Sequence, residues 1–446
     1  MGIFCTAVKS LFIRSVLLAC ALALLPVFIT ATTPAVVAQE GSAGGKERKT
    51  RKTPSMSEKV YKKLTEAQEL IEAKNYEEGL AALDDLAREP KLSNYEKAQL
   101  YNYFAYTYFT LERYEDAIAS YEQVLAQPDL PEALETNSLY TLAQLYFIIE
   151  NYRKAVDVIN KWFAVTEKPT ENAYMLLGQG YYQLEEYENS LVPLKKAYAM
   201  VKARGDIPKE NLLLLLRVDY FNLNDYENML AVLKELVEYY PKQEYWLTMA
   251  GTYSELKRLD KQMSILEMLY EAGQLERGNQ QLNLANLYML HEAPYKAAVL
   301  LDKGMKEEKI EQNIRNLRLL SQAWLQAQEN EKSLPPLIQA AKLSKDGELD
   351  MRLAQAYINL YRYDEAVASL RTAFKKGGLK RSDQANIMLG LALFEIQKFD
   401  ASIAAFAEAS KDERSHKAAQ TWLGYVNSEK ERKKQLEESL KQRRRS

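Results

Sequence analysis

The sequence predicts an all-α protein built as a solenoid of about ten helix–turn–helix units. A frame of aromatic and small residues recurs at intervals of 33 to 39 residues, which is typical of a repeat architecture. Thirteen prolines and 17 glycines are few for 446 residues, and strand-like runs bounded by turns are absent after residue 38. The chain exceeds the usual size of a single core, but a solenoid escapes that limit because its core grows in one dimension.

The frame is clearest over residues 113–128, RYEDAIASYEQVLAQP. Tyr114 and Ala117 begin a stripe that continues at helical spacing, which predicts one face of a short amphipathic helix. Ala105 and Tyr108 precede Tyr114 by nine and six residues and belong to a second helical stretch. Two such helices with small residues at their crossing form an αα-hairpin. A single hairpin leaves apolar surface uncovered, so it needs neighbouring hairpins.

The same frame recurs along the chain. We call its aromatic residue the anchor of each unit, and a small or medium residue follows the anchor three positions later. The pairs are Tyr76/Gly79, Tyr114/Ala117, Tyr152/Ala155, Tyr187/Ser190, Tyr226/Met229, Tyr295/Ala298, Tyr363/Ala366 and Phe399/Ser402, with degenerate copies near Leu259 and Asn330. Small residues stand nine positions before seven anchors, at Ala67, Ala105, Ala143, Gly178, Ala250, Ala354 and Gly390.

This period and signature resemble the tetratricopeptide repeat (TPR) over about Ser57 to Ser428. The resemblance implies a TPR superhelix, an α-solenoid with a C-terminal capping helix, for which Ala418–Val426 is the candidate. Arg217 stands where a small residue is expected, and Met229 and Gln262 stand where alanine is usual. We expect those units to pack less regularly.

The sequence divides into five predicted parts. Residues 1–38 have the layout of a secretory signal peptide, with cleavage after Ala38 and a periplasmic location expected; the alternative is an inner-membrane anchor over residues 15–38. Both cysteines lie in this segment. A basic flexible linker (39–56), an N-terminal solenoid (57–275), a C-terminal solenoid with its cap (276–428) and a charged tail (429–446) follow. Pro335-Pro336 and the degenerate units predict either a hinge or a local packing defect in the middle of the solenoid.

Catalytic, cofactor and metal sites are not expected. His291 and His416 lie 125 residues apart in different units, and no phosphate-binding loop or metal-ligand spacing occurs. Residues 56–428 carry 44 basic and 55 acidic side chains, a net charge of −11, which argues against a nucleic-acid groove. The basic linker and tail are either solvated segments or peripheral contacts with a membrane or an acidic partner.

The TPR resemblance also implies a partner-binding groove, because in that family the first helix of each unit lines the concave face. Amides there suit a peptide backbone, and aromatic rings supply contact area. The alternative is that several of these rings pack between units. The positions carried over by offset, called here the first-helix row, are Asn102, Tyr106, Phe109, Tyr140, Gln144, Phe147, Met175, Gln179, Tyr182, Asn211, Leu214, Phe221 and Asn222.

A second resemblance concerns the entry to the solenoid. Glu47–Leu64, ERKTRKTPSMSEKVYKKL, follows the predicted signal peptide and precedes about ten units, and it is similar to periplasmic TPR proteins associated with TonB–ExbB–ExbD systems. That resemblance implies a protein or peptide partner among TonB, ExbB and ExbD, and a role in outer-membrane uptake of iron complexes. A scaffold for outer-membrane or exopolysaccharide export and a glycan-binding protein are the alternatives.

Overall fold

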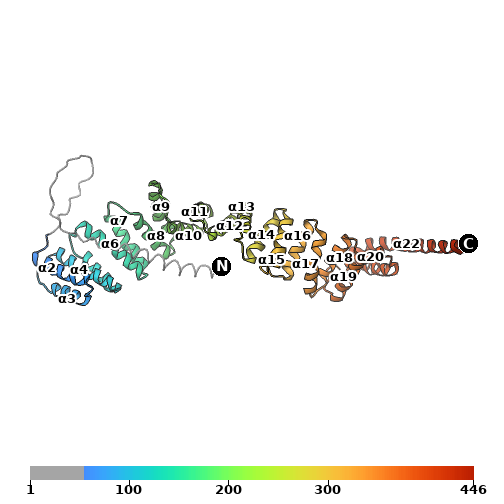
Figure 1. Cartoon of the computed structure of the whole chain (residues 1–446), viewed down its shortest axis with the longest axis horizontal. Coiled ribbons are helices and arrows are strands. Elements are labelled where there is room, and N and C mark those ends of the chain that lie inside the picture. The colour runs from blue at the N-terminus through green and yellow to red at the C-terminus, as the bar shows by residue number, and fades with distance from the viewer. Residues whose placement is uncertain (1–54, 446) are drawn as a thin grey trace. The chain divides into compact units, whose positions relative to one another are not determined.

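The computed structural model describes residues 55–445, and these residues form 21 helices and no strand (Figure 1). The predicted all-α fold is therefore confirmed. The predicted signal peptide and most of the linker lie outside the described residues. Contacts divide the chain into two units, the first ending at Tyr240 and the second beginning at Pro241.

Unit 1 contains five consecutive hairpins. Its helices are α2 (Glu58–Glu72), α3 (Tyr76–Ala87), α4 (Asn94–Thr110), α5 (Tyr114–Leu125), α6 (Glu132–Ile148), α7 (Tyr152–Val165), α8 (Glu171–Gln183), α9 (Tyr187–Ala203), α10 (Glu210–Asn222) and α11 (Tyr226–Tyr239). Each second helix packs against the first helix of its own hairpin, and α3, α5, α7 and α9 also pack against the first helix of the next hairpin. The core is therefore continuous from hairpin to hairpin.

Unit 2 contains five further hairpins and a long last helix. Its helices are α12 (Gln243–Glu255), α13 (Leu259–Glu271), α14 (Gly278–Leu290), α15 (Pro294–Lys306), α16 (Ile314–Gln326), α17 (Asn330–Leu343), α18 (Glu348–Asn359), α19 (Tyr363–Lys376), α20 (Ser382–Glu395), α21 (Phe399–Ala409) and α22 (Glu413–Arg445). Because α13 packs on α14 within this unit, the predicted division near residue 275 differs from the division by contacts.

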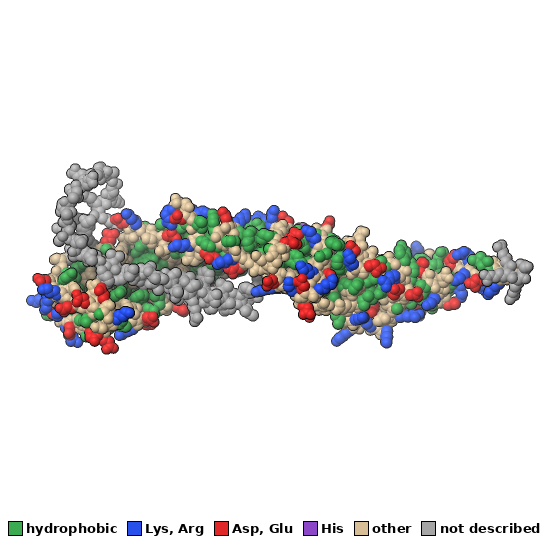
Figure 2. All heavy atoms as spheres, in the orientation of Figure 1, with side chains coloured by type: hydrophobic (Ala, Val, Ile, Leu, Met, Phe, Trp, Pro, Cys, Tyr) green, Lys and Arg blue, Asp and Glu red, His purple; other side chains and the backbone are tan. Residues whose placement is uncertain are grey.

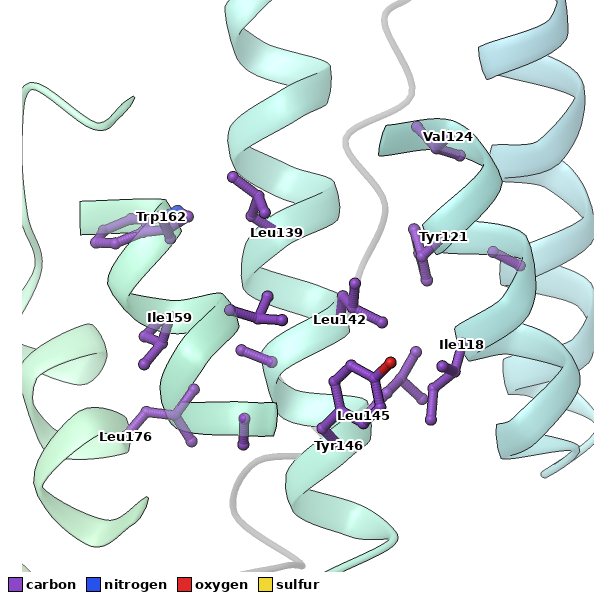
Figure 3. Packing of buried hydrophobic residues seen from close by; sticks show 14 of the residues in the cluster. Ile118, Tyr121, Val124, Leu139, Leu142, Leu145, Tyr146, Ile159, Trp162 and Leu176 are labelled. Atoms are coloured by element: carbon purple, nitrogen blue, oxygen red, sulfur yellow. The ribbon is translucent and has the colours of Figure 1, made fainter. Parts of the chain in front are cut away.

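The core is built from the anchor frame. Figure 3 shows Ile118 and Tyr121 of α5 facing Leu142 and Leu145 of α6, while Ile159 of α7 lies on the other side of α6. These side chains are at least 90% buried. Burial of apolar surface at about 25 cal/mol per Å² is the main stabilising contribution to such a core.

The small residue nine positions before the anchor lies at the helix crossing. Ala105, Ala143 and Ala354 have no exposed surface. At Gly178 a Cβ atom would come within 2.5 Å of Leu194 Cδ2, so even alanine is too large there. The assignment of these positions to the crossing is confirmed.

Every hairpin turn has the same backbone conformation. The residue two positions before the anchor has a left-handed φ between 56° and 66°, and none of these ten residues is glycine. The next residue donates its backbone N–H to the carbonyl six positions before the anchor, at 2.8–2.9 Å, as Arg113 does to Tyr108. This pair of features is a Schellman motif, which satisfies the last carbonyl groups of the first helix.

The seventh hairpin corrects one predicted register. Its turn residue is Glu292 and α15 begins at Pro294, so the anchor position belongs to Pro294 rather than to Tyr295. The proline replaces the aromatic residue because its fixed φ suits the first position of a helix. With this register Ala285 and Ala297, both fully buried, occupy the crossing, and Tyr295 is half exposed.

The eighth hairpin is also more regular than its sequence indicates. Ser321, Trp324 and Ser333 occupy the small and aromatic positions of the frame and are all buried. Pro335 and Pro336 lie inside α17, which continues through both. The hairpins that carry Arg217, Met229 and Gln262 touch over fewer residues than α4–α5 does, as their departures from the frame predict.

The capping helix is confirmed, and it continues through the charged tail. α22 packs on α20 and α21 and runs from Glu413 to Arg445. Trp422 stacks on the buried ring of Phe406, with centroids 5.7 Å apart and an interplanar angle of 4°. Asp383 at the start of α20 accepts a hydrogen bond from Ser415 Oγ at 2.7 Å and pairs with Arg381, which fixes the start of α22.

Candidate protein-binding surface

The first-helix row lies on four consecutive first helices of unit 1, α4, α6, α8 and α10 (Figure 1). Eleven of its thirteen side chains are partly buried, and only Phe221 and Asn222 are exposed. The row residues of α4, α6 and α8 stand twelve, eight and five positions before their anchors; in α10 Leu214 and Phe221 keep this register, whereas Asn211 and Asn222 do not. The row contains two kinds of side chain. Most of its aromatic rings pack within their own hairpins, whereas its polar groups do not.

Three rings of the row close their own hairpins. Each lies five positions before an anchor tyrosine and contacts it through the turn. The ring centroids are 6.1 Å apart for Phe109 and Tyr114, 5.0 Å for Phe147 and Tyr152, and 6.1 Å for Tyr182 and Tyr187. Aromatic pairs at such distances stabilise a fold beyond the area they bury. These rings therefore have a structural role whether or not a partner binds.

Tyr140 is held in a similar way. Its ring centroid lies 5.5 Å from that of Trp162 in α7, and Trp162 is 7% exposed and contacts Phe163 edge-on. Replacing Tyr140, Phe147 and Tyr182 together by alanine would disturb hairpins as well as any binding surface. The polar members of the row are better probes of binding.

Two amide oxygens of the row are buried without a protein partner. These are Oε1 of Gln144 in α6 and Oδ1 of Asn211 in α10. A buried acceptor without a donor costs about 1–3 kcal/mol. A bound N–H group would relieve that cost, so both oxygens are suited to a ligand that carries hydrogen-bond donors.

An amide ladder one turn earlier in the same helices was missed from the sequence. Gln99, Asn137 and Asn172 stand fifteen residues before their anchors, as Asn211 does before Tyr226. Asn137 and Asn172 are exposed. The first-helix row was chosen by its distance from the small residue of each unit. Comparing the residues fifteen positions before each anchor would have revealed the ladder. Four consecutive first helices thus present an amide at the same position.

A buried carboxyl group lies in the last of these helices. Asp219 of α10 has no exposed surface, and burial raises the pKa of its carboxyl to about 7, with the Ser190 hydroxyl of α9 as its polar neighbour. Ser190 Oγ donates its hydrogen bond to the carbonyl of Gly178 at 2.9 Å, and neither oxygen of Asp219 has a hydrogen-bond partner. The protonated carboxyl is the form that suits this environment.

Other kinds of site were sought over the same part of the chain. Within residues 55–445 no group of three or more His, Cys, Asp or Glu side chains is placed to hold a metal ion. His291 ends α14, and His416 Nδ1 lies 2.6 Å from the carbonyl of Ser410; both side chains are exposed. None of the described helices has the length and apolar character needed to cross a bilayer.

Family models match two stretches of the chain. Residues 66–198 match the RNPP family C-terminal domain, and residues 351–415 and 387–434 match the tetratricopeptide repeat. No curated protein matches the sequence.

Similar solved structures include "MamA MSR-1 C2", with 23% identity and a TM-score of 0.32, covering 39% of this chain and 98% of that one. A tetratricopeptide repeat protein from Parabacteroides merdae has 14% identity and a TM-score of 0.32, covering 67% of this chain and 99% of that one. No conclusion about function follows from similarities at this level.

The repeat frame, the ten hairpins and the match over residues 351–434 agree with one another. Residues 351–434 match the tetratricopeptide repeat, and the same hairpin frame continues through the rest of the described chain.

Proposed function

We propose that this protein is a binding scaffold whose first-helix row holds an extended segment of a protein partner. The observation that carries the proposal is the pair of buried, unpartnered amide oxygens of Gln144 and Asn211. An extended polypeptide offers N–H donors at regular intervals, and such donors suit the unpartnered acceptors that lie on α6 and α10. The exposed amides of Asn137 and Asn172 add groups that both donate and accept.

A sugar ligand fits the same surface less well. Stacking on a sugar needs an aromatic face open to solvent, whereas Phe109, Phe147 and Tyr182 lie against anchor rings and Tyr140 lies against Trp162. Partner selection by hydrogen bonds to a peptide main chain uses the groups that remain available. The protein scaffold is therefore preferred to the glycan-binding alternative.

The finer proposal is that the protein is exported to the periplasm and serves as an accessory component of a TonB–ExbB–ExbD system in iron uptake. Two features of the sequence support it: the signal-peptide layout of residues 1–38 and the resemblance of Glu47–Leu64 to TPR proteins associated with such systems. On this proposal a periplasmic segment of TonB, ExbB or ExbD occupies the first-helix row.

The binding surface is tested by crosslinking in cells. The variant Asn137→Ala/Asn172→Ala/Asn211→Ala removes three amides of the ladder. The matched control Gln123→Ala/Asn160→Ala/Asn189→Ala removes three exposed amides from the second helices α5, α7 and α9. We expect the ladder variant to recover less partner than the wild type and the control to recover as much. Equal recovery from all three would exclude the row.

The identity of the recovered proteins tests the finer proposal separately. Recovery of TonB, ExbB or ExbD by the wild type supports it. Recovery of polysaccharide-export proteins instead would overturn the TonB assignment and leave the scaffold. For export, N-terminal sequencing of the native protein is expected to begin near Gln39, and an intact Met1 in membrane-embedded material would contradict cleavage.

A further inference from the structure

We propose that unit 2 carries a second binding surface, specific for an extended acidic peptide and separate from the first-helix row of unit 1. The surface consists of nine exposed side chains on the consecutive first helices α14, α16 and α18, and we call it the arginine–amide stripe. Its members are Asn279, Asn283 and Asn286 of α14, Arg315, Arg318 and Gln322 of α16, and Arg352, Gln355 and Asn359 of α18.

The spacing within each helix places the three side chains on one face. Asn279, Asn283 and Asn286 are separated by four and three residues, and the triplets of α16 and α18 by three and four. Residues at i, i+3 or i+4, and i+7 form one helical stripe. All nine residues are exposed, so this face is not used in packing between the hairpins of unit 2.

The three arginines of the stripe have no acidic partner among the described residues. Most other arginines do: Arg362 pairs with Glu365, and Arg381 pairs with Asp383. The two carboxylates of α18 are engaged elsewhere: Asp350 pairs with Lys376 Nζ at 2.7 Å, and Glu348 accepts the backbone N–H of Lys380 at 2.6 Å. The arginine charges of the stripe are therefore available to a ligand.

The stripe contains no carboxylate, whereas the first helices on either side of it carry exposed acidic side chains. Exposed Glu244 and Glu255 lie on α12, and exposed Glu395 lies on α20. On the face of the molecule seen in Figure 2, acidic and basic side chains are interspersed, which is the ordinary arrangement of a protein surface. Nine exposed positions without an acid depart from that arrangement and delimit a site three hairpins long.

The two units differ in net charge, and unit 2 is the more positive. Residues 55–240 carry 31 acidic and 19 basic side chains, a net charge of −12, whereas residues 241–446 carry 28 acidic and 33 basic side chains, a net charge of +5. Residues 429–446 of α22 contribute +4 of this charge, so residues 241–428 carry +1; an anionic segment is attracted by the tail and is not repelled by the rest of unit 2 as it is by unit 1. Long-range attraction of this kind raises association rates and is weakened by salt.

The chemistry of the stripe identifies the class of ligand. Guanidinium groups form bidentate hydrogen bonds with carboxylates, and amides pair with peptide N–H and C=O groups. Three consecutive first helices offer such groups at three successive places along an extended chain. Three arginines are few for a nucleic acid, and the stripe offers no aromatic ring for base stacking.

Fluorescence anisotropy with the full-length protein tests the proposal. The probe is a fluorescein-labelled peptide in which glutamate alternates with serine, and its matched peptide has glutamine at every glutamate. The variant Arg315→Gln/Arg318→Gln/Arg352→Gln removes the three charges of the stripe. The control Lys342→Gln/Arg371→Gln/Lys375→Gln removes three exposed charges from the second helices α17 and α19.

We expect the wild type to bind the glutamate peptide, with an affinity that falls as salt is raised. The stripe variant should bind it about tenfold or more weakly, since three exposed ion pairs are lost, while the control should stay within about twofold. Circular dichroism should be unchanged for both variants, because all six side chains are exposed.

Several outcomes would overturn the proposal. They are absence of binding to the glutamate peptide, equal binding of the glutamine peptide, equal weakening by the control variant, and competition by single-stranded DNA as effective as that by the peptide. A negative result would overturn only the arginine–amide stripe and not the proposal for the first-helix row of unit 1, because the ladder variant changes none of the residues of the stripe. The two surfaces are therefore separable in experiment.

Discussion

Asp219 is a carboxyl group whose surroundings favour its neutral form, because burial raises its pKa. Its carboxyl is fully buried between α9 and α10, with no charged partner for either oxygen. In the unfolded chain the pKa of an aspartate is about 3.9, whereas burial raises the folded pKa to about 7. The folded protein therefore holds a proton that the unfolded chain releases at neutral pH.

The first prediction follows from that difference. The favourable contribution of Asp219 to stability is fully present below about pH 4 and is lost as the pH rises through about 7, and the total change is about 4 kcal/mol. Asp219→Asn lacks this titration, so at pH 8 it should be more stable than the wild type. Urea unfolding from pH 4 to 8 measures the difference between the two proteins. Parallel pH profiles would show that Asp219 is not protonated in the folded state.

A second residue-scale prediction compares two helical glycines. Gly178→Ala places a Cβ atom 2.5 Å from Leu194 Cδ2, and Leu194 has no exposed surface and no room to move. The expected loss of stability is about 1–3 kcal/mol. Gly251→Ala is the control, since nothing lies within 4 Å of its Cβ position, and it should stabilise α12 by about 0.5–1 kcal/mol. Denaturant midpoints that move in the same direction would contradict this account.

At the level of helices and hairpins, much of the fold can be predicted from residues that lie close together in the sequence. Nine of the ten second helices begin at the residue that periodicity identifies as the anchor, because that residue starts the apolar stripe and follows the turn. The exception is α15, where Pro294 takes the first helical position and displaces Tyr295 by one residue. Burial was less predictable. The rings of Phe109, Phe147 and Tyr182 meet their anchors across a turn, a contact that helical spacing alone does not reveal.

The third prediction concerns the prolines of α17. Pro335 is exposed and lies inside the helix, where it removes one backbone hydrogen bond and crowds the preceding turn. Pro335→Ala should therefore stabilise unit 2 by about 1–3 kcal/mol. Pro336→Ala should gain less, because Pro336 is buried and its truncation leaves a cavity. Thermal unfolding of both variants decides the matter; a gain confined to Pro336→Ala would refute it.

For the whole molecule, the decisive feature is how each unit ends. A repeat array exposes an apolar face at its last hairpin unless a further helix covers it. In unit 2 that cover is the first part of α22, where Ala419 and Val426 are fully buried and Trp422 stacks on Phe406. Beyond this part, Leu436 and Leu440 are exposed. The first part of α22 therefore stabilises the last hairpin, whereas the part after Ser428 is charged and mostly exposed.

The fourth prediction tests that difference between the two parts by truncation. Ending the chain after Ser428 removes the charged part of α22 and retains Trp422 and Val426, so the unfolding temperature should stay near that of the full chain. Ending it after Asp412 exposes Phe406 and should lower the unfolding temperature and promote aggregation. Differential scanning calorimetry with light scattering measures both. Similar behaviour of the two truncations would show that α22 is not a cap.

The sequence carries less information about the longer scale. The boundary between units depends on how many contacts cross each junction, and the missing aromatic residues near Leu259 did not reveal that α13 and α14 pack together. The two proposed binding surfaces could be predicted only in part from the sequence for a similar reason. The frame identifies which residues support each hairpin, and the residues left over, such as Arg315 and Asn172, stand out only when exposure is known.

The left-handed turn residues have a consequence for engineering. Such a conformation costs a non-glycine residue about 1–2 kcal/mol, and the chain accepts that strain ten times without once using glycine. Each site therefore offers a gain of up to about 1 kcal/mol on mutation to glycine, after allowance for the greater freedom of glycine when unfolded. Ten different single substitutions to glycine are therefore each expected to raise the stability of the protein. None of them alters a buried side chain.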